Sequence, residues 1–264
     1  MKIKVQCPAK INLTLKVINK REDGFHNIES IMQTISLYDY LTISVEESAR
    51  YDIELSGNSN EIPYNEKNLV FKAAMLFVER TNIPPCKINI FIDKNIPVSA
   101  GLAGGSTDAA GTLYGLNKLF NEPLSKVELH ELCAKLGSDL NFCLEGGRKM
   151  TKGRGEIIEP LDFTEFNVSL IKPVNLGISA KEAYTKFALK NEAKKSGREN
   201  YKNDLEWAVI DDYKELQHIK ELYPEAVMSG SGSVYFGVDM EFMPQEGYWI
   251  KNSLKAVDIG ITVL

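Results

Sequence analysis

A glycine-rich loop directly before a helical stretch constrains this chain more than any other feature. Residues 96–110 read Ile-Pro-Val-Ser-Ala-Gly-Leu-Ala-Gly-Gly-Ser-Thr-Asp-Ala-Ala, and a helix is expected at 106–120. Glycine lets backbone N–H groups converge, and a helix N-terminus carries about half a positive charge. The loop therefore predicts a site for an anion such as the phosphates of a nucleotide.

The loop matches neither of the two common phosphate-binding sequences. It lacks the GxxxxGK[ST] pattern of the P-loop and the GxGxxG spacing of dinucleotide-binding folds. A flexible hinge before an ordinary helix is the alternative. The hydroxyls of Ser106 and Thr107 can cap the helix, bind phosphate or ligate Mg²⁺, while Asp108 can complement the helix dipole or help to hold the metal.

Strand-like segments dominate the chain before the loop. They are short, rich in branched or aromatic residues, and bounded by turn formers such as Asp23-Gly24 and Gly57-Asn58, so they predict a largely antiparallel sheet. One helix is expected at 68–80, where apolar residues recur every three or four positions. The expected strands are 3–7, 11–17, 31–36, 41–45, 51–55 and 87–92.

The second half of the chain mixes helices with strands. Ser125 with Glu128 and Ser179 with Glu182 have the spacing of capping boxes, which predicts helices at 126–135 and from 180 to 189. We expect further helices at 204–212 and 214–222, a basic, glycine-rich connection at 146–155, and strands at 156–159, 168–172, near 226, at 234–238 and at 259–264. The balance predicts an α+β protein with lobes at 1–155 and 156–264.

Charge and cysteine content exclude several classes of function. The 264 residues include 31 Lys and Arg against 36 Asp and Glu, a net charge of −5, so we expect no nucleic-acid partner. The four cysteines lack zinc-ligand spacing and are expected to be free thiols. No apolar run approaches the roughly 18 residues of a membrane span, and no signal-like segment is recognisable, so we expect a cytoplasmic protein without a membrane partner.

Three separated stretches carry a resemblance to a known family. They are Pro8-Ala-Lys-Ile-Asn-Leu13, the loop at 97–110 and Gly230-Ser-Gly232, and together they resemble the GHMP kinase superfamily of small-molecule kinases. Two further motifs, Asp23-Gly-Phe-His26 and Leu136-Gly-Ser-Asp-Leu140, resemble those of the kinases of cytidine diphosphate methylerythritol. The motifs span residues 8–232, which is nearly the whole chain.

The resemblance implies both a fold and an activity. The fold would be two-lobed, with a ribosomal-S5-like N-terminal lobe, a ferredoxin-like C-terminal lobe, and ATP and substrate in the cleft between them. The enzyme would transfer the γ-phosphoryl group of ATP, with Mg²⁺, to the 2-hydroxyl of the methylerythritol unit, in the methylerythritol phosphate route to isoprenoid precursors. We expect this small-molecule kinase to be a monomer or a weak homodimer.

The same resemblance assigns the reacting groups. Asp139 matches the catalytic aspartate of the family and Lys10 matches its catalytic lysine. A carboxylate can accept the proton of the substrate hydroxyl, while an ammonium beside it keeps it ionised and offsets charge on the transferring group. The substrate residues would be Asn12 near the reacting end, Phe25 and His26 on the face and edge of the cytosine, and Tyr184 on its other face.

The nucleotide would lie along the glycine loop. Asn68 and Lys94 are expected near the adenosine, with Ser106 and Thr107 as candidate contacts for Mg²⁺. The residues expected around the triphosphate are Pro97, Val98, Ser99, Ala100, Gly101, Leu102, Ala103, Gly104, Gly105, Ser106 and Thr107. Three positions depart from the common family pattern, since Ala103 stands for glycine, Thr107 for serine and Asn141 for proline. Because alanine disfavours positive φ, we expect the loop to sit slightly differently.

Two other functions stay open. Another kinase of the superfamily, acting on mevalonate, homoserine or a sugar, would leave Phe25 and His26 without a cytosine to contact. A non-catalytic S5-like module that binds RNA or protein would need neither Lys10 nor Asp139. Without the family, Lys10 reads as an edge-strand charge, Asp139 as a helix cap, Asn12 as a turn amide, Phe25 and Tyr184 as core residues, His26 as a surface residue and 230–232 as a plain turn.

Overall fold

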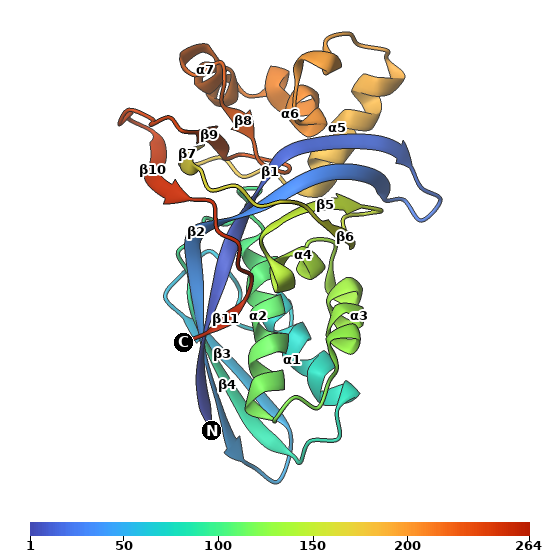
Figure 1. Ribbon diagram of the computed structural model, residues 1–264, viewed down its shortest axis with the longest axis vertical. Coiled ribbons are helices and arrows are strands. Elements are labelled where there is room, and N and C mark those ends of the chain that lie inside the picture. Colours follow the sequence, from blue (N-terminus) through green and yellow to red (C-terminus); the bar gives the residue numbers. More distant parts are fainter.

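Two β-sheets organise the chain, of which the computed structural model describes residues 1–264 (Figure 1). The first sheet has seven strands in the order β11-β1-β2-β4-β3, with β5 pairing with β2 and β6 with β5. The second has four, in the order β10-β7-β9-β8. Their bounds are β1 Lys2–Lys20, β2 His26–Glu47, β3 Asp52–Gly57, β4 Cys86–Asp93, β5 Arg148–Lys152, β6 Ile157–Pro160, β7 Asn167–Pro173, β8 Val227–Met228, β9 Tyr235–Val238, β10 Tyr248–Lys255 and β11 Thr262–Val263.

The first two strands are much longer than the sequence pattern predicts. β1 and β2 pair antiparallel from Lys2 opposite Ser44 to Lys20 opposite His26, so the four segments expected at 3–7, 11–17, 31–36 and 41–45 merge into two. Register shifts occur between residues 8 and 9, 12 and 14, and 17 and 19. Irregularities of this kind bend a strand and break its alternation, which is why the pattern looks interrupted.

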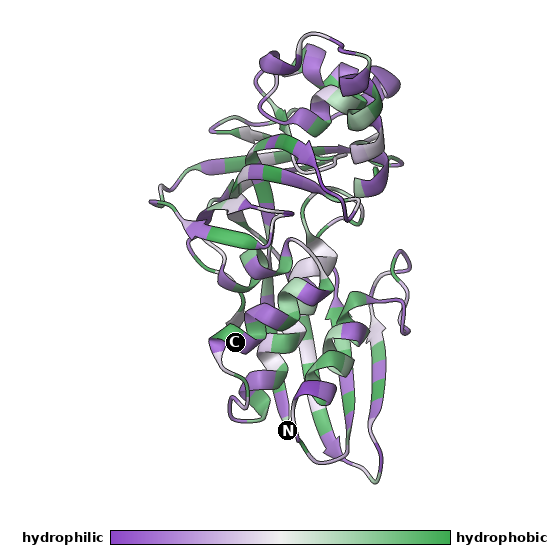
Figure 2. Cartoon of the chain, turned by 90° about the vertical axis from the view of Figure 1, so that its right-hand side faces the viewer, coloured by the Kyte–Doolittle hydropathy of each residue, from purple (hydrophilic) through white to green (hydrophobic).

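Helices cover one face of the first sheet. Figure 1 shows α2 Gly104–Leu119 along the sheet, with α1 Leu69–Arg80, α3 Lys126–Leu136 and α4 Leu140–Glu145 beside it. Apolar and polar residues alternate along the strands (Figure 2), as expected for a sheet buried on one face only. The capping box predicted from Ser125 and Glu128 is confirmed, because each side chain bonds to the other's backbone N–H.

A second layer of helices packs beside the antiparallel pair β1–β2, called here the β1–β2 ribbon, at the end where β1 leads into β2. It contains α5 Ala180–Glu192, α6 Asp204–Val209 and α7 Lys214–Leu222. Residues of the ribbon are buried in one cluster with these helices and the second sheet, namely Leu15, Val17 and Ile28. A further apolar cluster joins the glycine loop to β1 and β7, and it includes Ala100, Leu102, Ile11, Val168 and Leu170.

Several local expectations are corrected. The connection expected at 146–155 contains β5, whose polar sequence hides its pairing with β2, and neither α4 nor β10 was expected. The helix expected at 204–212 ends at Val209 and continues as the 3₁₀ turn Ile210–Asp212. Short segments of this kind are held by their neighbours rather than by their own periodicity.

The α+β class is confirmed. The strands of each sheet bear on the expected division of the chain into two lobes. β6 and β11 follow residue 155, yet they belong to the first sheet. We keep the division into 1–155 and 156–264 as a proposal for the two lobes. None of the helices combines the length and apolar character that crossing a membrane requires.

Candidate active site

Lys10 is buried in the middle of β1, just after the irregularity between residues 8 and 9. Its side chain is 3% exposed, and its Nζ donates to Asn12 Oδ1 at 2.6 Å and to the carbonyl of Gly101 at 3.0 Å. Asp139 Oδ2 lies 3.5 Å from the same nitrogen. The structure therefore brings together the two residues expected to react, although they lie far apart in the sequence.

Asp139 occupies the position before α4 but does not cap the helix. Its side chain makes no capping hydrogen bond, and it is 27% exposed. The carboxylate is therefore available to a ligand rather than committed to the fold. Asn141, where the family often has proline, lies in the first turn of α4 and donates from Nδ2 to the carbonyl of Glu156 at 3.0 Å.

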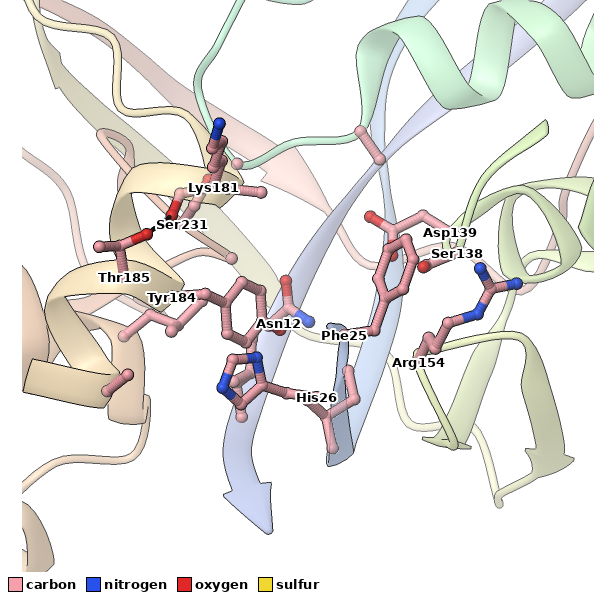
Figure 3. A pocket seen from close by; sticks show the side chains of 18 of the residues that line it. Asn12, Phe25, His26, Ser138, Asp139, Arg154, Lys181, Tyr184, Thr185 and Ser231 are labelled. Atoms are coloured by element: carbon pink, nitrogen blue, oxygen red, sulfur yellow. Dashed lines mark hydrogen bonds between the residues drawn. The ribbon is translucent and has the colours of Figure 1, made fainter. Parts of the chain in front are cut away.

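A cavity of about 820 Å³ opens in front of this pair (Figure 3). It lies between the end of the β1–β2 ribbon, the glycine loop and α5. All of the predicted catalytic and substrate residues line it, and Gly230 and Ser231 of the loop before β9 join them. The predicted residues concerned are Lys10, Asn12, Phe25, His26, Asp139 and Tyr184.

The aromatic residues of this cavity form two groups. The rings of His26 and Tyr184 are stacked, with centroids 4.9 Å apart and planes 13° apart. Phe25 is half exposed, and the Arg154 guanidinium lies 4.9 Å from its ring centre. In Figure 3 Phe25 and Arg154 lie to the right of the His26–Tyr184 pair. His26 thus covers one face of the Tyr184 ring.

Burial also sets the protonation of the stacked pair. Burial, with a smaller contribution from the charge of Lys20, lowers the pKa of His26 below its usual value. The ring is therefore neutral at pH 7 and can offer one N–H donor and one acceptor nitrogen. Burial raises the pKa of Tyr184, so its hydroxyl keeps its proton.

A second, smaller cavity of about 230 Å³ runs along the glycine loop. It is lined by Asn68, Lys94 and the whole run from Pro97 to Ser106, as predicted for a nucleotide site. Gly101, Ala103 and Ser106 line both cavities, so a molecule in one lies next to a molecule in the other. Thr107 lines neither cavity, because it is fully buried at the start of α2.

The loop has the left-handed backbone that its glycines suggest. Gly101 has a φ of 78°, and Ala103 has a φ of 59° although it carries a side chain. This conformation costs a non-glycine residue about 1 kcal/mol. Ala103 therefore holds a positive φ at a position where the family often has glycine.

A buried charge network lies beneath the loop. The Lys94 ammonium, 5% exposed, contacts the carboxylates of Asp39 and Asp108. Asp39 Oδ1 also accepts the backbone N–H groups of Asn95 at 2.5 Å and Ile96 at 2.8 Å, where the loop begins. A Cβ at Gly104 would lie 2.7 Å from Lys94 Nζ, so a larger residue there would displace the ammonium. The Lys94 side chain thus supports the loop from below.

The two carboxylates of this network share a single ammonium. Burial raises the pKa of Asp108 to about 7, and the charge of Asp39 adds to the increase while Lys94 opposes it. Asp108 Oδ1 has no hydrogen-bond partner.

The side chain of Asn68 is used by the fold. It caps α1 by accepting a hydrogen bond from the backbone N–H of Val70, and it donates to the carbonyl of Pro63.

No group of three or more His, Cys, Asp or Glu side chains is arranged to bind a metal ion. Oxygen donors nevertheless gather near the start of α2. Ser106 lines both cavities, and behind it the buried Thr107 Oγ1 and Asp108 Oδ1 lack partners. Of these residues, Ser106 and Asp108 line the smaller cavity, and their oxygens fit a Mg²⁺ ion whose other ligands are phosphate oxygens and water, which is how this ion commonly binds.

Several residues of the larger cavity were missed by the sequence analysis. Arg154 stands in the turn Gly153-Arg154-Gly155, and its backbone N–H and guanidinium are both held by Glu156. A basic residue between two glycines was the available signal, but nothing local connects that turn to Phe25. Other polar cavity residues that were missed include Lys20, Ser138, Lys181, Thr185 and Glu192.

Comparison with known proteins gives one consistent result. A family model described as GHMP kinases N terminal domain matches residues 68–147. A protein of Clostridium perfringens named 4-diphosphocytidyl-2-C-methyl-D-erythritol kinase is 38% identical, over 98% of this chain and 97% of its own. A protein of the same name from Thermoanaerobacter pseudethanolicus is 41% identical, over 90% of this chain and 87% of its own.

Solved structures agree with the sequence comparison. A crystal structure of 4-(cytidine 5'-diphospho)-2C-methyl-D-erythritol kinase superposes with a TM-score of 0.72 at 26% identity, covering 97% of this chain and 100% of the other. A homoserine kinase from Cytophaga hutchinsonii superposes with a TM-score of 0.71 at 16% identity, over 100% and 97% of the two chains. At that identity the second match shows the shared fold alone.

Proposed function

Because the chain belongs to the family of 4-diphosphocytidyl-2-C-methyl-D-erythritol kinases, we propose that its two adjoining cavities hold the nucleotide and the substrate of that reaction. The enzyme phosphorylates the 2-hydroxyl of 4-(cytidine 5'-diphospho)-2-C-methyl-D-erythritol, in the methylerythritol phosphate route to isoprenoid precursors. The single observation that carries our assignment is the Lys10–Asp139 pair, 3.5 Å apart and in the larger cavity.

ATP is the phosphate donor, and we assign it to the smaller cavity. The backbone of residues 97–106 would face the phosphates, with the N-terminus of α2 favouring their negative charge. Ser106 is the residue best placed to contact a bound Mg²⁺, and Asp108 lies two residues after it in α2 and also lines the smaller cavity. When bound, the ion neutralises charge on the phosphate oxygens.

Asp139 would accept the proton of the substrate hydroxyl. Its carboxylate is free of capping bonds, and it needs only to come within hydrogen-bond reach of the reacting oxygen. The Lys10 ammonium beside it would offset the negative charge that gathers around the transferring phosphoryl group. A tertiary alcohol is a crowded nucleophile, so the positioning of these two groups accounts for much of the expected rate.

The aromatic groups would recognise the cytosine. Phe25 on one side and the His26–Tyr184 stack on the other provide flat surfaces for a planar base. A neutral His26 can both donate to and accept from the hydrogen-bonding edge of the base. We also propose that the enzyme works in the cytoplasm, as a monomer or weak homodimer without a nucleic-acid partner.

A panel of phosphate acceptors tests this function. The purified protein is incubated with Mg²⁺ and ATP and, in parallel, with the cytidine diphosphate substrate, mevalonate, homoserine and galactose. ADP release and product mass are then read. We expect phosphate gain only with the cytidine compound. Phosphorylation of another acceptor would retain the kinase chemistry but remove the role of Phe25 and His26, and binding of ATP without ADP release would overturn the catalytic assignment of Lys10 and Asp139.

A further inference from the structure

A buried serine, Ser229, forms hydrogen bonds with both residues that accept hydrogen bonds from the Lys10 ammonium. The Ser229 hydroxyl donates to the carbonyl of Gly101 at 2.9 Å and accepts the backbone N–H of Asn12 at 3.3 Å. Gly101 and Asn12 are the two residues that accept hydrogen bonds from the Lys10 ammonium. Ser229 is fully buried and does not line either cavity, so it reaches the ammonium only through these neighbours.

The segment that carries Ser229 is itself fixed on both sides. Asn203, fully buried, donates from Nδ2 to the carbonyls of Met228 at 2.7 Å and Gly230 at 2.8 Å, which flank the serine. The backbone N–H of Met228 donates to Glu206 Oε2 at 3.1 Å. The serine therefore has little freedom to follow a movement of the glycine loop.

The two loops also touch too closely for side chains. A Cβ at Gly101 would lie 1.9 Å from the carbonyl oxygen of Ser229. A Cβ at Gly230 would lie 3.0 Å from the carbonyl oxygen of Gly101 and 3.2 Å from Lys10 Nζ. The backbone N–H of Val234 adds a hydrogen bond to the carbonyl of Ala100 at 3.2 Å. The segments around residues 101 and 229 are thus in close backbone contact.

The geometry points to Ser229 as a positioning residue, which sets the place of the Lys10 ammonium by joining Asn12, the carbonyl of Gly101 and the loop held by Asn203. This inference rests on the proposed role of Lys10. A shift of reacting groups by about 1 Å can slow an enzyme by about a hundredfold. Loss of the hydrogen bonds made by the Ser229 hydroxyl is therefore expected to lower kcat. Substrate affinity should change little, because Ser229 touches neither cavity.

The test compares Ser229→Ala with Ser229→Thr, which keeps the hydroxyl, and with Ser233→Ala. Ser233 is a matched control, since it is equally buried and its hydroxyl bonds to the carbonyl of Leu176 instead. We expect Ser229→Ala to lower kcat by about ten- to a hundredfold with both KM values within about twofold, and Ser233→Ala to leave kcat unchanged. Recovery of most of kcat by Ser229→Thr would assign the loss to the hydroxyl.

A double-mutant cycle separates positioning from general damage. Each substitution at Ser229 is made again in a Lys10→Met background, and single-turnover ADP formation is measured. If Ser229 acts through Lys10, the second substitution adds little to the loss caused by the first, whereas independent effects multiply. Multiplying losses, or a wild-type kcat in Ser229→Ala, would overturn the inference. A wild-type rate in Lys10→Met alone would instead overturn the proposed function.

A variant that folds poorly does not prevent the test. Ser229→Cys retains the size of the side chain and a weak S–H donor, so it should fold and give a kcat between those of the parent and Ser229→Ala. Thermal midpoints and the shift produced by ATP are recorded for every variant. A loss of kcat in Ser233→Ala as large as that in the Ser229 variants would contradict a specific role for residue 229.

Discussion

The side chains of the reacting pair differ in how firmly the fold holds them. Lys10 has three acceptors around its ammonium, namely Asn12 Oδ1, the carbonyl of Gly101 and the carboxylate of Asp139. Asn12 is in turn held by Ser30, to whose Oγ it donates at 2.7 Å. Asp139 has no such second partner in its helix. The lysine is therefore preorganised, while the carboxylate retains the freedom to meet a hydroxyl.

Replacing Asp139 by asparagine tests its role as a proton acceptor. Asp139→Asn keeps the shape of the side chain but removes its charge, and we expect kcat to fall by about 10²- to 10⁴-fold with little change in the KM for ATP. ADP release under saturating substrates measures the effect. Asp162→Asn is the control, because Asp162 is exposed and lines neither cavity. A residual rate close to that of the parent enzyme would exclude Asp139 as the proton acceptor.

Phe25 offers a separate test of cytosine recognition. Stacking of an aromatic residue on a base is worth about 1–3 kcal/mol, so Phe25→Ala is expected to raise the KM for the cytidine substrate by about five- to 150-fold. Phe25→Tyr keeps the ring and should remain near the parent value. The KM for ATP should not change in either variant, because Phe25 does not line the smaller cavity. Equal effects on both KM values would argue against stacking.

Among the structural elements, the glycine loop depends on a charge network that lies outside it. Asp39 comes from β2 and Lys94 follows β4, while Asp108 lies in the first turns of α2. Through this network the ends of the loop are tied to the first sheet and to the helix that follows. The loop can then keep positive φ at Ser99, Gly101 and Ala103.

Asp39→Asn is expected to loosen the start of the loop. The substitution keeps one acceptor for the N–H groups of Asn95 and Ile96 but weakens the contact with Lys94. We expect the KM for ATP to rise by about tenfold, in line with the loss of a charge-assisted bond, while the KM for the cytidine substrate changes less. Asp93→Asn, at the end of β4 and outside the network, should change neither value.

The network also predicts how stability depends on pH. The pKa of Asp108 is about 7 in the folded protein against an ordinary value of 3.8. Between these values the folded state binds a proton that the unfolded state has released, so the contribution of Asp108 to the free energy of unfolding falls as the pH rises from about 4 to about 7. Above pH 7 this contribution is constant.

Denaturant unfolding of the parent and of Asp108→Asn between pH 4 and pH 8 checks this dependence. The asparagine side chain does not titrate, so the parent should lose stability relative to the variant as the pH rises through this window. The difference between the two proteins should then stay level up to pH 8. A difference that stays constant from pH 4, or that changes in the opposite direction, would contradict the pKa of Asp108.

At the level of the whole molecule, the last residues return to the first sheet. Ile261 is 6% exposed within the apolar cluster of that sheet, and β11 pairs with β1. The chain thus crosses from the first sheet to the second and back. Together with the apolar cluster that joins the glycine loop, β1 and β7, this return links the two halves into one packed structure.

Ile261→Ala tests this link. Removal of a buried isoleucine side chain costs about 2–5 kcal/mol, and we expect a corresponding fall in the free energy of unfolding, within a single transition. Ile259→Ala is the matched control, because Ile259 is 40% exposed and its truncation should change stability by about 0.5 kcal/mol or less. Unchanged stability in Ile261→Ala would mean that the C-terminal segment contributes little to the core.

Local features were predicted well because their causes lie within a few residues. The helix expected at 68–80, the capping box at Ser125 and the glycine loop before a helix all depend on neighbouring side chains and backbone sterics. The resemblance to a kinase family added Lys10 and Asp139, whose chemistry alone did not distinguish them from a strand charge and a helix cap. The roles given to these residues stay proposals.

The sequence by itself determined the α+β class, the glycine loop before a helix and, through a resemblance, the family of kinases, because those follow from short motifs and periodicity. Only the tertiary structure decided that Gly101 and Ser229 meet beside Lys10, that Arg154 lies over Phe25, and that His26 covers Tyr184. Residues so far apart in the chain come together through the packing of the two sheets and their helices. That packing depends on many tertiary contacts at once, so no local sequence pattern predicts it.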